Sequence, residues 1–187
     1  MNVPNLITMA RLFSVPVVVW LILDGDMLVA FWVFLIAALS DAADGIIAKQ
    51  FDSETVFGAF LDPIADKALL VSVYLTLGHQ GYLETWLVIM VVFRDAVIVG
   101  GAILFHTVTL SLTMQPLLIS KVNTFMQLIL AIGVLGMEGF QVDDGVAIDI
   151  IVFIVVVTTA WSGVGYVVKW SQRATALESG GDAEKGL

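Results

Sequence analysis

The chain of 187 residues contains no cysteine, and it has only 8 lysine and arginine residues against 17 aspartate and glutamate residues. Without cysteine it forms no disulfide, no thiolate zinc site and no thiol nucleophile. Its net charge of −9 excludes a nucleic-acid binder held by phosphate contacts. Charged residues make up 13% of the chain and apolar residues 59%, whereas soluble domains have about 25% and roughly 45–50%. Because a soluble enzyme of this size could not bury so much apolar surface, the composition predicts a membrane protein.

Six apolar stretches are candidates for transmembrane helices, since a bilayer core of about 30 Å needs about 20 mostly apolar residues per helix. They lie at residues 9–23, 27–48, 56–77, 83–105, 119–137 and 146–170. We therefore predict an all-α integral membrane protein with six transmembrane helices in one catalytic domain, residues 1–172. A short interfacial helix at residues 1–7 is expected before the first span. A flexible cytoplasmic tail is expected at residues 173–187.

The basic residues predict the orientation of these spans. If the N-terminus is inside, six crossings return the C-terminus to the same side. The basic residues that then lie at or near the inner ends of the helices are Arg11, Lys49, Lys67, Lys121, Lys169 and Arg173. The three outer hinges then hold acidic residues and no lysine or arginine. Because lysine and arginine favour the cytoplasmic side, both termini are predicted to be cytoplasmic. The expected location is the inner (cytoplasmic) membrane, with the active site facing the cytoplasm.

Four aspartates lie inside two of the predicted spans, Asp41 and Asp44 in the second and Asp62 and Asp66 in the third. An ionisable group inside a span is costly and usually marks a functional site. In a helix Asp41 and Asp44 lie one turn apart, and Gly58, Asp62 and Asp66 form one stripe. The short linker between the two spans makes them antiparallel neighbours. Both carboxylate pairs should therefore lie at a similar depth below the cytoplasmic surface.

Four carboxylates so close together would repel one another and partly protonate unless cations neutralised them. Oxygen ligands without histidine or cysteine suit Mg²⁺ or Mn²⁺, with a substrate phosphate at the open positions. Two such ions would bind a diphosphate and stabilise charge on the attacking and leaving oxygens. One carboxylate could accept the proton of an attacking hydroxyl. Gly45 and Gly58 fit either ligand access or close helix packing.

The spacing of these residues resembles a known family signature. The stretch is Asp41-x-x-Asp44-Gly45-x-x-Ala48-Lys49, eight residues, and Gly58-x-x-x-Asp62-x-x-x-Asp66. It is similar to the signature of the CDP-alcohol phosphatidyltransferases at every fixed position but one. The family has arginine where this chain has Lys49. Lysine keeps the charge but lacks the planar fork that binds phosphate through two hydrogen bonds.

The resemblance implies a homodimer of six-helix subunits, each with a cavity open to the cytoplasm. It implies CMP as the leaving group from a CDP-linked lipid, and two metal ions. The implied metal ligands are Asp41, Asp44, Asp62 and Asp66, with Asp66 also the catalytic base. The motif positions implied to lie near the nucleotide are Gly45, Ala48, Lys49 and Gly58. The opening segment of the chain, residues 4–11, also resembles that of the family and adds Asn5 and Thr8.

Later segments resemble one branch of the family. The run ISKVNTFMQLIL, residues 119–130, and the sequence Thr158-Thr159-Ala160 are similar to the CDP-diacylglycerol-dependent cardiolipin synthases. Phosphatidylglycerophosphate synthases typically have a second lysine where Asn123 stands. An acceptor phosphate site of Arg94, Lys121 and neutral Asn123 suits the single charge of phosphatidylglycerol better than the nearly double charge of glycerol 3-phosphate. The expected reaction transfers phosphatidyl from CDP-diacylglycerol to phosphatidylglycerol.

Three alternatives stay open. The first is the same chemistry with glycerol 3-phosphate as acceptor, in a phosphatidylglycerophosphate synthase. The others are a divalent-cation transporter, which would need binding groups along a two-sided pathway, and a non-catalytic relative.

Single residues of the predicted acceptor site also have structural alternatives. Arg94 could instead pair with acids inside the membrane, and Lys121 could anchor its helix at the inner surface. Asp95 is expected to be structural or to support Arg94.

Overall fold

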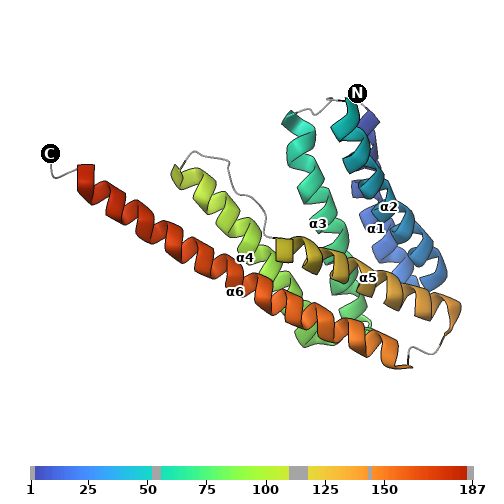
Figure 1. Ribbon diagram of the computed structural model, residues 1–187. Helices are drawn as coiled ribbons and strands as arrows, with labels where there is room; N and C mark the ends of the chain where they lie inside the picture. Colours follow the sequence, from blue (N-terminus) through green and yellow to red (C-terminus); the bar gives the residue numbers. More distant parts are fainter. Residues whose placement is uncertain (1–2, 52–55, 110–117, 143–144, 185–187) are drawn as a thin grey trace.

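The computed structural model describes residues 3–51, 56–109, 118–142 and 145–184, drawn as coloured ribbon in Figure 1. Side chains are described for residues 8–40, 67–101, 118–142 and 146–168. In these ranges the chain is helical and has no strand. The helices are α1 (Val3–Asp24), α2 (Met27–Phe51), α3 (Val56–His79), α4 (Thr85–Thr109), α5 (Leu118–Phe140) and α6 (Gly145–Glu184). The predicted all-α class and the six helices are confirmed.

In two of the predicted hinges, a glycine with a positive φ follows the end of a helix. Gly25 has a φ of 88°, and the next amide, of Asp26, donates to the carbonyl of Leu21 at 2.9 Å. Gly81 has a φ of 86°, and the amide of Tyr82 donates to a carbonyl of α3. Glycine adopts this left-handed conformation without the steric penalty of a Cβ atom, which is why it commonly follows the end of a helix.

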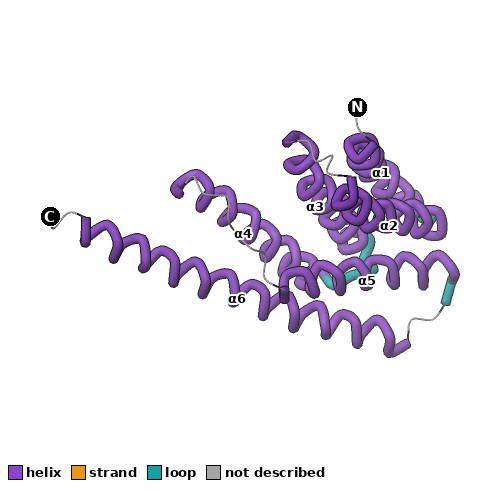
Figure 2. Tube along the Cα trace, turned by 45° about the horizontal axis from the view of Figure 1, so that its top comes forward, coloured by secondary structure: helices purple, strands orange, loops and turns teal. Residues whose placement is uncertain are grey.

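The helices form two groups that α5 connects. α1 packs against both α2 and α3, whereas α4 packs mainly against α6 and less against α3. α5 packs against α2 on one side and α6 on the other. In Figure 1 the end of α2 and the start of α3 lie at the same end of the molecule, so these helices run in opposite directions, as predicted. Figure 2 shows α4 and α6 leaning away from the first three helices, with α5 between the groups.

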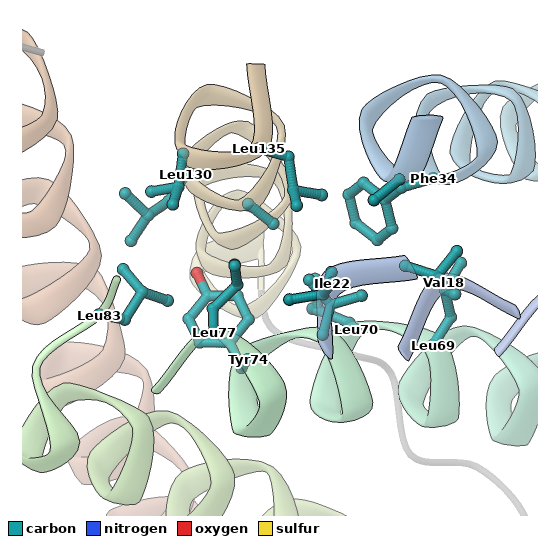
Figure 3. Packing of buried hydrophobic residues seen from close by; sticks show 14 of the residues in the cluster. Val18, Ile22, Phe34, Leu69, Leu70, Tyr74, Leu77, Leu83, Leu130 and Leu135 are labelled. Carbon is teal, nitrogen blue, oxygen red and sulfur yellow. The ribbon is translucent and has the colours of Figure 1, made fainter. Parts of the chain in front are cut away.

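A core of buried apolar side chains holds the helices together, with members from α1 to α6 (Figure 3). Most of its largest members come from α1, α2, α3 and α5, and Leu87 and Val91 of α4 and Val155 of α6 join them. They include Val18 and Ile22 of α1, Phe34 of α2, Val73, Tyr74 and Leu77 of α3, and Leu130 and Leu135 of α5. The hydroxyl of Tyr74 donates to the main-chain carbonyl of Gln127 at 3.0 Å, so this buried polar atom is satisfied.

α5 approaches the start of α2 closely at Gly139. A Cβ atom at this position would lie 2.7 Å from the Cα atom of Leu28, which leaves no room for any side chain. The missing side chain therefore permits the contact between the end of α5 and α2.

The exposed surface is strongly apolar. Two helical stretches of the described part, Leu118–Phe140 and Val146–Val168, are long and apolar enough to cross a membrane by length and composition. Large apolar side chains such as Phe13, Phe93 and Trp161 are mostly exposed on the outer faces of the helices. Monomeric soluble proteins rarely expose large contiguous apolar patches.

The helix ends differ from the sequence prediction at both termini. α1 is one continuous helix from Val3, so the separate short helix predicted at residues 1–7 is not present as such. Between Asn5 and Arg11 no glycine or proline interrupts the helix. α6 continues to Glu184, through residues for which a tail was predicted. Residues 173–178, Arg-Ala-Thr-Ala-Leu-Glu, contain good helix formers, which favours helix beyond residue 172, and α6 also includes Gly180 and Gly181.

Candidate functional site

The positions of the sequence motif fall in the second half of α2 and the first half of α3. The structure describes the helices there but not the side chains. The side chain of Asn5 also lies outside the described residues. The motif residues placed by helix position alone are Asp41, Asp44, Gly45, Ala48, Lys49, Gly58, Asp62 and Asp66.

A cavity of about 390 Å³ lies among α1, α2, α3 and α5. Its polar lining residues are Arg11, Ser120, Lys121 and Thr124. Its apolar lining residues are Phe34, Ala38, Leu69, Leu70, Phe125 and Leu128. The cavity thus combines two cationic side chains and two hydroxyls with an apolar wall, a lining that suits a phosphate attached to a hydrocarbon chain.

The cavity wall continues the helix faces that carry the motif. On α3, Leu70 follows Asp66 by four residues and Asp62 by eight, so these positions share one stripe of the helix. On α2, Ala38 precedes Asp41 by three residues. At a rise of about 1.5 Å per residue, both spacings correspond to about one turn. The positions of Asp66 on α3 and Asp41 on α2 are therefore about one turn from the cavity wall, and the positions of Asp62 and Asp44 lie about one further turn away.

A buried cluster of charged groups joins α3 to α4. Lys67 Nζ lies 2.6 Å from Asp95 Oδ2, and Arg94 Nη1 lies 2.6 Å from Asp95 Oδ1. The side chains of Arg94 and Asp95 are each 4% exposed, whereas that of Lys67 is 30% exposed. Arg94 is therefore paired with an adjacent acid inside the bundle. The pairing of Asp95 with both cations agrees with the supporting role expected for it.

Arg94 also reaches hydroxyl groups on the two neighbouring helices. Its Nη2 donates to Ser120 Oγ of α5 at 2.6 Å and to Ser162 Oγ of α6, which also accepts from Nε at 3.2 Å. Ser120 lines the cavity, whereas Arg94 does not. Arg94 thus lies one hydrogen bond behind the cavity wall.

The structure separates the three residues predicted to bind the acceptor phosphate. Lys121 lines the cavity directly. Asn123 is fully buried, and its Oδ1 accepts hydrogen bonds from the hydroxyls of Thr158 and Thr159 on α6, both at 2.8 Å. Its Nδ2 has no hydrogen-bond partner among the described residues. Asn123 therefore connects α5 to α6 and does not line the cavity.

Sequence reasoning assigned no site role to Arg11, Ser120 or Thr124, which line the cavity. Thr8, predicted near the nucleotide, is buried on α1 one turn before Arg11. The sequence offered one signal for Arg11, a cation inside an apolar span, which often marks a functional site. The two hydroxyl residues carry no comparable signal, because serine and threonine are tolerated at many helix positions.

Among the side chains that the structure describes, no group of three or more His, Cys, Asp or Glu residues could hold a metal ion. The aspartate quartet of the motif, whose side chains lie outside the described ones, is the group of carboxylates that falls inside two of the apolar helices. Carboxylates of this kind are the ligands that Mg²⁺ and Mn²⁺ prefer, so the quartet stays a predicted metal site.

Comparison with known proteins identifies the family. The profile of the CDP-alcohol phosphatidyltransferases matches residues 1–164. The chain is 34% identical over 190 residues to the chloroplastic CDP-diacylglycerol–glycerol-3-phosphate 3-phosphatidyltransferase 1 of Oryza sativa subsp. japonica, covering 92% of this chain and 58% of that protein. It is 32% identical over 181 residues to the cardiolipin synthase (CMP-forming) of Rattus norvegicus, covering 88% and 60%.

A third relative is the probable phosphatidylglycerophosphate synthase of Mycobacterium tuberculosis, 31% identical over 176 residues, with 90% of this chain and 81% of that protein covered. The chain spans about three fifths of the length of the rice and rat proteins. The relatives thus include proteins named as cardiolipin synthase and proteins named for phosphatidylglycerophosphate synthesis. The match along most of its length shows that this chain belongs to the CDP-alcohol phosphatidyltransferase family.

Proposed function

We propose that the chain is a cardiolipin synthase that transfers a phosphatidyl group from CDP-diacylglycerol to phosphatidylglycerol. A free hydroxyl oxygen of phosphatidylglycerol forms a bond to the β-phosphorus of CDP-diacylglycerol. The bond from that phosphorus to the bridging oxygen breaks, and this oxygen leaves with CMP. Asp66 takes the proton of the attacking hydroxyl. The products are cardiolipin and CMP.

The observation that carries this proposal is the cavity beside the motif. Its wall continues the stripes of α2 and α3 that hold the aspartates, and it combines Arg11 and Lys121 with apolar side chains. The phosphate of a lipid needs cationic side chains near its charge, and the hydrocarbon chains attached to it need an apolar wall. The protein's contribution is then to hold donor and acceptor in line.

The donor set of the motif fits divalent cations. Four carboxylates and no histidine or cysteine suit Mg²⁺ or Mn²⁺, and we propose two such ions held by Asp41, Asp44, Asp62 and Asp66. When bound, they would neutralise charge on the diphosphate and on the leaving oxygen.

The other residues of the site divide between donor and acceptor. The proposed nucleotide contacts are Asn5, Thr8, Gly45, Ala48, Lys49 and Gly58. On the acceptor side Lys121 contacts the phosphate from the cavity wall, and Arg94 acts from behind Ser120. Asn123 supports this wall from the α5–α6 contact, since its carbonyl is engaged by two threonines.

We also propose that the six helices span the inner membrane, with both termini in the cytoplasm, and that the protein is a homodimer. The exposed apolar side chains and the absence of basic residues from the three outer hinges support the membrane orientation. The family resemblance is the support for the homodimer.

A phosphatidylglycerophosphate synthase is the second candidate, because the rice and mycobacterial relatives are named for that activity. The burial of Asn123 away from the cavity weakens the argument that its neutrality selects the acceptor. The resemblance of residues 119–130 and 158–160 to the cardiolipin synthases is what favours phosphatidylglycerol, because the apolar wall would accept the acyl chains of CDP-diacylglycerol with either acceptor.

The test supplies the purified protein with CDP-diacylglycerol, Mg²⁺ and one acceptor at a time. Release of CMP is measured, and the lipid product is identified by mass. Phosphatidylglycerol should give cardiolipin, and glycerol 3-phosphate should give little product. Efficient formation of phosphatidylglycerophosphate would instead establish the second candidate. Metal flux into proteoliposomes without CMP release would support a transporter.

A further inference from the structure

Asp95 holds two cations that come from different helices. One carboxylate oxygen contacts Lys67 of α3, and the other contacts Arg94 of its own helix, α4, each at 2.6 Å. Because each oxygen serves a different cation, the loss of the negative charge of Asp95 would release both.

The contact with Arg94 extends to the cavity wall. Arg94 donates from Nη2 to Ser120, which lines the cavity beside Lys121, and to Ser162 of α6. A guanidinium is planar and rigid, so a partner that fixes one edge also fixes the direction of the others. Asp95 thus determines the position of a cavity hydroxyl through Arg94.

The contact with Lys67 extends to the motif. Lys67 directly follows Asp66, and Leu69 and Leu70 of the cavity wall follow within the next turn. α3 contacts α4 much less than it contacts α1. The ion pair between Lys67 and Asp95 therefore ties this turn of α3 to α4 where little else does.

Stability alone does not account for this cluster. A buried ion network pays for the lost hydration of its charges, and well-packed apolar side chains of similar volume often stabilise a protein as much or more. Lys67 and Arg94 together also exceed the charge of Asp95, so the cluster carries one net positive charge. A negatively charged phosphate in the adjoining cavity would neutralise it.

We propose that Asp95 is a positioning residue for the acceptor phosphate. It holds Arg94, Ser120 and Lys67 in the arrangement that receives this phosphate next to the reaction centre. The inference rests on the proposed function, because it requires a phosphate-bearing acceptor, and it holds for phosphatidylglycerol and for glycerol 3-phosphate alike.

The decisive variant is Asp95→Asn in the full chain, which keeps the side-chain shape and removes the charge. The Michaelis constant for the acceptor should rise about tenfold, equivalent to about 1.4 kcal/mol. The Michaelis constant for CDP-diacylglycerol should change less than about twofold, because the donor's nucleotide is proposed to bind at the motif. Asp95→Glu should recover part of the loss, since it restores the charge.

A milder variant keeps the proposal testable if Asp95→Asn does not fold. Ser162→Ala removes one hydrogen-bond acceptor of Arg94 and leaves all charges in place. It should raise the Michaelis constant for the acceptor about threefold, with an unchanged value for the donor.

Thr76→Val is the matched control. It removes a buried hydroxyl that bonds only within α3, to the carbonyl of Ser72, away from the cluster. It should leave both Michaelis constants unchanged. The contrary outcome is that Asp95→Asn lowers kcat only as far as it lowers stability and leaves the Michaelis constant for the acceptor unchanged. Asp95 would then be structural and the proposal wrong. The same outcome for Ser162→Ala decides the question if Asp95→Asn does not fold.

The wild-type protein separates this inference from the proposed function. CMP release with either acceptor establishes the transferase, and the variants are then measured with the acceptor that works. No CMP release with either acceptor would overturn the proposed function and this inference together.

Discussion

The hydroxyl of Tyr74 on α3 donates to the main-chain carbonyl of Gln127 on α5, 3.0 Å away in the buried core. Gln127 lies in the middle of α5, and its side chain is also fully buried. Neither its Nε2 nor its Oε1 has a hydrogen-bond partner among the described residues. The hydroxyl of Tyr74 should therefore stabilise the contact between α3 and α5, whereas the buried amide of Gln127 should destabilise it. One substitution at each residue can measure the two effects separately.

Tyr74→Phe removes the hydroxyl and leaves the carbonyl of Gln127 with its helical hydrogen bond alone. The free energy of unfolding should fall by about 1 kcal/mol, the usual net value of one buried hydrogen bond. Thermal unfolding in a fixed detergent measures the change. Both Michaelis constants should stay at their wild-type values, because neither residue lines the cavity. An unchanged unfolding temperature would show that the hydrogen bond contributes nothing.

Gln127→Met should be neutral or stabilising. An unsatisfied amide buried in an apolar core costs about 1–3 kcal/mol, and methionine has nearly the same length without the polar group. The same thermal unfolding measurement applies. Clear destabilisation by this variant would show that the amide has a partner in the folded protein, such as a bound water.

Gly139→Ala should destabilise the contact of α5 with α2. The new methyl group would lie 2.7 Å from the Cα atom of Leu28, so one helix must move away from the other. We expect a loss of about 1–3 kcal/mol, as for overpacked cores. Gly100→Ala on α4 is the control, because a Cβ atom there meets nothing within 4 Å. It should be neutral or slightly stabilising, and equal effects of both substitutions would contradict the packing argument.

Asp66→Asn should abolish turnover while the protein still folds and partly retains metal. The amide has the shape of the carboxylate but cannot take the proton of the attacking hydroxyl. CMP release should fall by at least about 100-fold, the lower end of the usual contribution of a general base. An activity close to that of the wild type would show that another group is the base.

Removal of divalent metal should stop the reaction. Treatment with a chelator is expected to abolish CMP release, and Mg²⁺ or Mn²⁺ should restore it, because four carboxylates are the proposed ligands. Binding of Mn²⁺, followed by electron paramagnetic resonance, gives a readout that does not depend on turnover. It should weaken in Asp41→Asn and remain unchanged in Gln127→Met. Full activity in the presence of the chelator would contradict the proposed metal site.

Much of the architecture was predictable from the amino-acid pattern. Apolar stretches separated by polar hinges predicted six helices, and Gly25 and Gly81 ended two of them where expected. Such features are local, since helix length and turn residues depend on a few neighbouring side chains. The motif from Asp41 to Asp66 was likewise readable, because its information lies in the spacing of residues along two helices.

The amino-acid sequence by itself therefore determined the family, the helices and the carboxylate motif, all of which depend on order and spacing along the chain. Only the tertiary structure decided which polar side chains meet. It turned Asn123 toward α6, placed Arg94 behind Ser120 and joined Lys67 to Asp95. These contacts depend on how the helices rotate and cross, and that results from packing over the whole bundle rather than from any local pattern.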